Sequence, residues 1–200
     1  MSWRRRNRWA LVALLPALAL ALLASSDRVG TYYWSGGDLH DARRGAPGSW
    51  VEHRGTAVTL DGEQTFEVAV RLDGLGDAVE GWGSTTVLTV PPGARAVRVD
   101  LSLRADPTAP LRGCRLAVRD AQGTRYDYDW AAGGGAQPAS PCVPPDAPGP
   151  AGGDIADPAT EQVRPDEWTV APVVLVPEGV EITEVLLWWT PPTYLALSSG

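Results

Sequence analysis

The chain has 200 residues and a formal net charge of -7, from 24 acidic and 17 basic side chains. This acidic balance argues against nucleic acid and against anionic lipid surfaces as partners, because both carry dense negative charge. The length suits one domain with a sizeable core.

The N-terminus carries the clearest signal in the sequence. Four arginines between positions 4 and 8 stand directly before an apolar run from Trp9 to Ala24. A cationic start followed by an apolar segment of about 16 residues is typical of an export signal. The sequence therefore predicts that the chain after Ser26 lies outside the cytoplasmic membrane.

Two fates of residues 1–26 remain open. A spanning helix needs roughly 20 apolar residues, and the run is shorter than that and contains Pro16. The small residues Ala24-Ser25-Ser26 suit a signal-peptide cleavage site. Conversely, the arginines and the flanking Trp3 and Trp9 could hold residues 9–24 in the bilayer as a single span with the C-terminus outside. No cysteine follows the run directly, which argues against lipid attachment there.

Residues 27–55 show no sustained period and are predicted to be a stalk or an irregular lead-in. From residue 56 the pattern alternates with period two, which is typical of half-buried strands. Asp61-Gly62 predicts a hairpin. Strands are expected at 57–60, 64–72, 85–90, 95–103, 114–119 and 124–130.

The C-terminal third starts with residues 131–167, which are rich in proline and glycine and are predicted to form a long surface loop. Two strands are expected at 168–176 and 180–190, and Pro172 marks the first as an edge strand or one that starts late. The second is apolar on both faces, as in an interior strand, and residues 194–197 could add a short edge. Together the strands predict an all-β, immunoglobulin-like antiparallel sandwich over residues 56–200.

The two cysteines, Cys114 and Cys142, most simply form one disulfide in an exported chain. The alternative is a redox or metal-binding pair of thiols. A metal site would need further ligands, and His40 and His53 are the only histidines. The sequence predicts no metal and no cofactor.

No catalytic residues are predicted. A nucleophilic triad needs a histidine base, and both histidines precede residue 56. Paired carboxylates for glycoside cleavage remain an alternative, although no spacing singles out a pair. Asp120, Asp127 and Asp129 suggest a calcium site, although the complete loop pattern of a calcium hand is absent.

Aromatic residues are the remaining candidates, with nine tryptophans against one phenylalanine. Tyrosine and tryptophan are frequent anchors at interfaces. Candidate partner-binding residues are Tyr32, Tyr33, Trp34 and Trp82. The tryptophans of predicted strands, Trp130, Trp168, Trp188 and Trp189, are expected to fill the core.

The order of these elements resembles a known family. An export segment, the strand Val97-Arg98-Val99-Asp100-Leu101 and the stretch from Cys114 to Tyr126 are similar to the immunoprotective extracellular proteins of actinobacteria and their uncharacterised relatives. The resemblance covers roughly residues 56–197 and implies an immunoglobulin-like sandwich. It implies no catalytic residue.

The sequence thus favours an exported or membrane-anchored binding module of the cell envelope that is not an enzyme. Its partner would be an unknown protein or envelope component, with the membrane as a further partner if residues 9–24 are retained. Two alternatives stay open: an exported cell-wall hydrolase that uses carboxylates, and an accessory subunit of a membrane complex.

Overall fold

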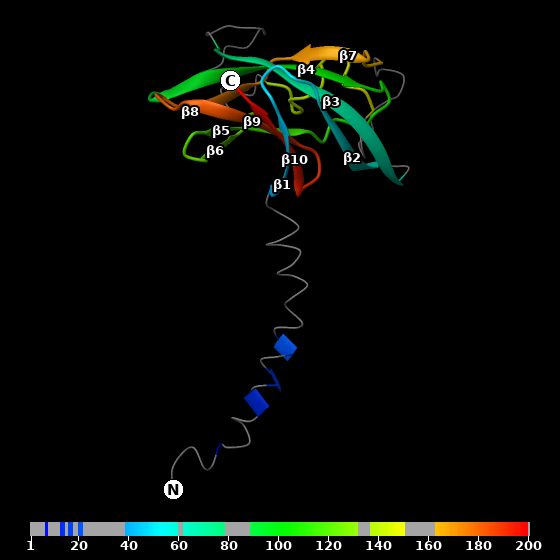
Figure 1. The fold of residues 1–200 in the computed structure, drawn as a ribbon, viewed down its shortest axis with the longest axis vertical. Helices are drawn as coiled ribbons and strands as arrows, with labels where there is room; N and C mark the ends of the chain where they lie inside the picture. Colours follow the sequence, from blue (N-terminus) through cyan, green and yellow to red (C-terminus); the bar gives the residue numbers. More distant parts are fainter. Residues whose placement is uncertain are drawn as a thin grey trace.

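The computed structural model describes residues 39–59, 62–78, 89–131, 137–150 and 163–199, with a few isolated positions between 7 and 21. The predicted export or anchor segment therefore lies largely outside the described residues. In the part that is described, no helix has the length and apolar character that crossing a bilayer requires. The folded part is a sandwich of two β-sheets (Figure 1), which confirms the predicted all-β sandwich.

The first sheet has five strands in the order β1-β10-β9-β5-β6. Their bounds are Asp41–Gly45 (β1), Arg115–Asp120 (β5), Arg125–Asp127 (β6), Ile182–Trp188 (β9) and Thr193–Ser198 (β10). Strand β9 is an interior strand, as its apolar sequence predicted. Strand β1 pairs with β10 in parallel, so the prediction of a purely antiparallel sandwich was wrong at this edge.

The second sheet has the order β2-β3-β4-β7, and β8 also pairs with β4. The bounds are Val51–Thr59 (β2), Gly62–Asp77 (β3), Ala94–Ala105 (β4), Glu167–Val170 (β7) and Val173–Pro177 (β8). The one strand predicted at 168–176 is thus two, separated at Ala171 and Pro172. Proline has no N–H to donate to the ladder, which accounts for the interruption.

The core lies between the sheets and is built from alternate residues of each strand. In β4, Val97, Val99, Leu101 and Leu103 are at most 2% exposed. In β3, the predicted inward residues from Phe66 to Leu72 are likewise buried. Burying each such side chain contributes about 1.5–3 kcal/mol, so the period-two pattern that predicted these strands is also what holds the two sheets together.

Three sequence predictions need correction. The sheets begin at Asp41, within the segment predicted as an irregular lead-in over residues 27–55, because β1 and most of β2 belong to it. The segment 194–197 is not an edge but part of β10, which lies between β1 and β9. Trp130 is 55% exposed rather than in the core. The strand predicted at 85–90 lies almost wholly outside the described residues.

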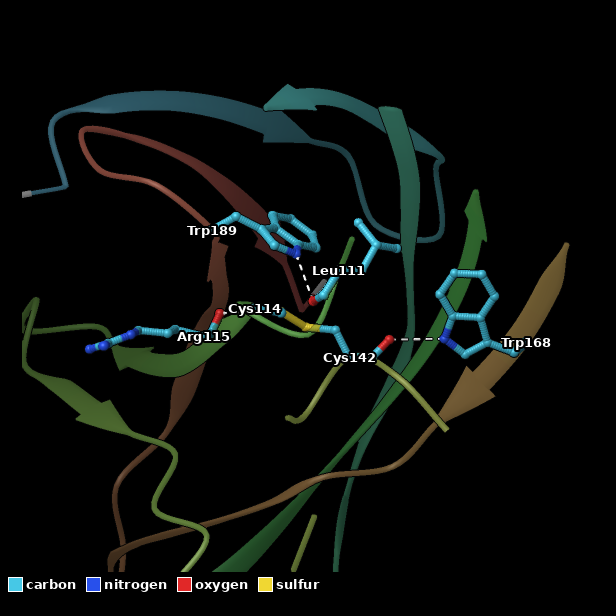
Figure 2. The surroundings of a disulfide bond; sticks show 6 residues. All are labelled: Leu111, Cys114, Arg115, Cys142, Trp168 and Trp189. Carbon is cyan, nitrogen blue, oxygen red and sulfur yellow. Dashed lines mark hydrogen bonds between the residues drawn. A yellow bond between two sulfur atoms is a disulfide. The ribbon is translucent and has the colours of Figure 1, made fainter. Parts of the chain in front are cut away.

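The predicted disulfide between Cys114 and Cys142 is present (Figure 2), with a Cα–Cα distance of 6.0 Å. It fixes the described part of the long loop, residues 137–150, to the segment that precedes β5. The Trp168 indole N–H donates a 2.9 Å hydrogen bond to the Cys142 carbonyl oxygen. The Trp189 indole N–H donates to the Leu111 carbonyl oxygen at 3.0 Å. Trp168 is therefore buried and Trp189 half-buried, and each indole N–H keeps a hydrogen-bond partner.

Arg164 fixes the same loop from its other end. Its side chain is fully buried and donates hydrogen bonds to the carbonyl oxygens of Pro148, Asp106 and Ala109. The guanidinium also lies 4.6 Å from the centre of the Trp168 ring. Burial lowers the pKa of Arg164 to about 10, against the opposing charge of Asp106, so the side chain stays a cation at neutral pH.

Candidate functional site

The outward side chains of the second sheet form a surface of alternating charge, which we call the charged face. Successive side chains along a strand point to opposite sides, so strands that bury Val68 or Leu103 turn their other residues outward. The charged face consists of Glu52, Arg54, Glu67, Ala69, Arg71, Ser102, Arg104 and Glu167. A cleft of about 1030 Å³ lies along β2, β3 and the end of β4.

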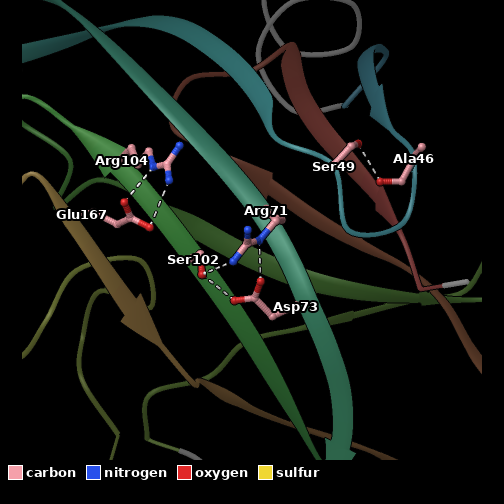
Figure 3. A network of polar contacts seen from close by, with 7 residues as sticks. All are labelled: Ala46, Ser49, Arg71, Asp73, Ser102, Arg104 and Glu167. Atoms are coloured by element: carbon pink, nitrogen blue, oxygen red, sulfur yellow. Dashed lines mark hydrogen bonds and ion pairs between the residues drawn. The ribbon is translucent and has the colours of Figure 1, made fainter.

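Cross-strand register sets two ion pairs on this face. Arg54 of β2 stands opposite Glu67 of β3, and the Arg54 Nε donates to a Glu67 oxygen at 2.8 Å. Arg104 of β4 stands opposite Glu167 of β7 and donates two hydrogen bonds to its carboxylate, at 2.8 and 3.3 Å (Figure 3). All four side chains are at least half exposed, so each pair stabilises the fold by only about 0.2–1 kcal/mol. Their main effect is to fix donors and acceptors in place.

A β-bulge adds a third group to the face. The register between β3 and β4 shifts between Leu72 and Gly74, which leaves Asp73 as the extra residue. Its carboxylate accepts hydrogen bonds from Arg71 at 2.6 Å and from the Ser102 hydroxyl at 2.5 Å (Figure 3). Arg71 also donates to the Ser102 oxygen at 3.2 Å. The bulge thus satisfies Ser102, a hydroxyl that is only 4% exposed.

Trp50, directly before β2, joins these charged groups. The guanidinium carbons of Arg71 and Arg104 lie 4.8 and 4.1 Å from the centre of its ring. A guanidinium at this distance from an indole is attracted by the negative face of the ring. Because the two arginines are themselves held by Asp73 and Glu167, the ring is oriented by the whole network. It lines a second hollow, of about 590 Å³, beside the cleft.

The cleft and the hollow beside it meet at Ala69, whose small side chain leaves space between the longer side chains on either side. Ala69 stands between Glu52 of β2 and Arg104 of β4, and all three residues line both hollows. In the part of the chain that the structure describes, no hydrogen bond or ion pair engages the exposed Glu52 carboxylate. Neighbouring strands lie about 4.8 Å apart, so the strands that carry Glu52 and Arg104 are roughly 10 Å apart, with the strand of Ala69 between them.

Two carboxylates of the charged face serve as hydrogen-bond acceptors within it. Glu67 and Glu167 each accept hydrogen bonds from an arginine. His53 also lines the cleft, but it is 3% exposed and its ring stacks on Trp189. Burial, with the nearby charge of Arg43, lowers the pKa of His53 below 6.5.

The residues predicted to form a calcium site are used elsewhere. Asp120 accepts hydrogen bonds from the backbone N–H groups of Gln122 and Thr124 and from the Tyr126 hydroxyl. Asp127 pairs with Arg125, and the Asp129 carboxylate accepts from the N–H of the second residue after it. Among the described residues, no three metal-binding side chains gather in a group that could hold an ion.

All four aromatic residues predicted to bind a partner, Tyr32, Tyr33, Trp34 and Trp82, lie outside the described residues. The sequence prediction missed Trp50. A signal for it existed, since Trp50, Glu52 and Arg54 alternate with Val51 and His53. Reading that alternation would have extended the strand N-terminally and placed Trp50 on the polar side of the sheet.

Comparison with known proteins adds little to this picture. The chain matches no family model and no curated protein. It is similar to a crystal structure of an uncharacterised β-sandwich protein from Clostridium difficile, with a TM-score of 0.40 and 8% sequence identity. The match covers 82% of this chain and 97% of the other. The resemblance to the actinobacterial extracellular proteins stays a prediction.

Proposed function

We propose that this chain is an extracytoplasmic binding module, not an enzyme, that contacts an envelope component through the charged face. Its compartment is argued from the cationic, apolar start of the sequence and from the disulfide, which forms and persists in oxidising environments. The sandwich would be of the immunoglobulin-like type, since β10-β9-β5-β6 has the G-F-C-C′ order of variable-type sheets.

The observation that carries the proposal is the preorganised polar row around Trp50. Donors and acceptors alternate along the cleft and are held by ion pairs that exist before a ligand arrives. Preorganisation lowers the entropic cost of binding. The balance of arginines and carboxylates favours a ligand that is itself uncharged and rich in hydroxyl groups. We therefore propose a neutral polysaccharide of the envelope as the ligand of the charged face.

The test compares two glutamates that share chemistry and exposure. Glu52 lies on the charged face, whereas Glu178 lies in the turn after β8, near the other end of β4. At a rise of about 3.3 Å per strand residue, the two positions are about 33 Å apart along β4. We expect the purified chain to be retained by envelope polysaccharide. Glu52→Ala should weaken retention several-fold, because a ligand hydroxyl loses its acceptor. Glu178→Ala should leave it unchanged.

Two results would contradict the proposal. Equal retention of both variants would remove the charged face as the binding surface. Release of soluble sugar from the polysaccharide, without stable retention of the protein, would favour the hydrolase alternative. A circular-dichroism spectrum of each variant checks that the fold is intact.

A further inference from the structure

A third hollow, of about 540 Å³, lies on the first sheet, on the side away from the core and beside the disulfide. We call it the arginine pocket. Its lining includes Arg112, Arg115, Arg125, Asp127, Trp130 and Trp188. A volume of this size is within the range of about 300–1,000 Å³ that small-molecule sites occupy.

The charge of the arginine pocket is opposite to that of the chain. Three arginines and one carboxylate line it, whereas the whole chain has a net charge of -7. Arg125 is neutralised by Asp127, with Nε and Oδ1 3.0 Å apart. Arg115 is exposed, and no ion pair or side-chain hydrogen bond to another described residue engages it. By contrast, Arg54 and Arg104 of the charged face are each held by a carboxylate.

Register on the first sheet places this free cation beside aromatic rings. Arg115 of β5 stands directly opposite Trp188 of β9. From β6, the Arg125 guanidinium reaches to 5.6 Å from the Trp188 ring, across the small side chain of Ala117. Trp130 lines the same hollow and is 55% exposed, which is unusual for so large an apolar side chain. The pocket therefore offers one unpaired guanidinium and one open indole.

We propose that the arginine pocket binds a carboxylated sugar unit of an acidic glycan. Arg115 would pair with the sugar carboxylate, since the planar guanidinium matches a carboxylate with two parallel hydrogen bonds. Trp130 would stack on the apolar face of the sugar ring. Asp127 would accept a hydrogen bond from a hydroxyl of the sugar. It would repel inorganic phosphate or a phosphate monoester, whose phosphate group carries nearly two negative charges, more strongly than a single carboxylate. This site differs in face and ligand charge from the charged face, and does not depend on the function proposed for it.

In the test, the full chain is titrated with three probes, and binding is followed by tryptophan fluorescence and by the heat released in calorimetry. They are an oligosaccharide of glucuronate, a glucose oligosaccharide of equal length, and inorganic phosphate. We expect the glucuronate probe alone to bind. Arg115→Ala and Trp130→Ala should each weaken its binding at least about tenfold, the effect of losing a hydrogen bond to a charged group or a buried stacking contact. Both side chains are exposed, so both variants should fold.

The matched controls are on the other sheet. Arg54→Ala removes an exposed arginine of the charged face and should leave glucuronate binding unchanged, as should Glu52→Ala. The proposal is overturned if the glucose oligosaccharide binds equally well, if phosphate binds as tightly as glucuronate, or if Arg115→Ala binds glucuronate like the unmodified chain. None of these results bears on retention of the chain by neutral polysaccharide.

Discussion

At the scale of single residues, His53 makes the stability of the sandwich depend on pH. Its ring lies 5.2 Å from that of Trp189 at an angle of 18°, and its Nδ1 is buried without a hydrogen-bond partner among the described residues. Burial, and then the positive charge of Arg43, lowers its pKa from 6.5. The folded chain therefore binds fewer protons at this site than the unfolded chain once the pH drops below 6.5.

We expect the free energy of unfolding to fall as the pH is lowered from about 7.5 to about 5. The contribution of His53 is fully present above the unfolded pKa and is lost as the pH falls through the lowered pKa of the folded state. Urea denaturation across this range measures the effect, and His53→Leu should flatten the profile. His40→Leu, at the other and exposed histidine, is the control. An unchanged slope in His53→Leu would show that His53 is not the titrating group.

At the scale of elements, alternation predicted strands well wherever one face of a strand is buried. Strand β4 alternates cleanly because Val99 and Leu101 face the core while Arg98 and Asp100 face outward. Strand β1 has no such signal, since its side chains are mostly exposed at the edge of the first sheet. Its parallel pairing with β10 depends on a partner about 150 residues away in the chain, which no local pattern reveals.

Single residues of the candidate sites leave a signal in the sequence, but neither site can be assembled from it, for the same reason. The charged face needs Trp50 and Arg104, which come from different strands and meet only through the order β2-β3-β4. The arginine pocket needs Arg115 opposite Trp188, which depends on the register of β5 and β9. Composition could show that tryptophan is abundant, but which indole remains exposed is decided by where the short strand β6 ends.

The loop from β6 to β7 is the element that the disulfide should stabilise. The bridge closes 28 residues, which corresponds to about 3.6 kcal/mol in the chain-entropy account. We expect the double variant Cys114→Ser, Cys142→Ser to lose about that much free energy of unfolding, measured by denaturation of the oxidised chain and the variant. Because Arg164 holds the loop independently, the variant should still fold. Equal unfolding midpoints would show that the bridge is dispensable.

At the scale of the whole molecule, the two sheets share one core and turn different chemistry to solvent. The second sheet balances each of Arg54 and Arg104 with a carboxylate, whereas the first sheet leaves Arg115 unbalanced beside Trp188. Residues on opposite outer faces have no shared contacts, so their substitutions should act additively. If both proposed ligands bind, we therefore expect that neither ligand changes the affinity of the chain for the other.

The disulfide also bears on the compartment proposed for the whole molecule, because such bonds are typical of oxidising environments. Cytosolic thiols are kept reduced, whereas exported chains are oxidised. We expect the intact chain, expressed in a bacterium, to contain the Cys114–Cys142 bond, and a chain lacking residues 1–26 to keep both thiols reduced. Alkylation of intact cells at lysis, followed by mass spectrometry, distinguishes the two states, and Cys114→Ser provides the control with a single thiol. The mass of the intact protein shows whether residues 1–26 are removed. Two free thiols in the full chain, or a bond in the truncated chain, would contradict export through the N-terminal segment.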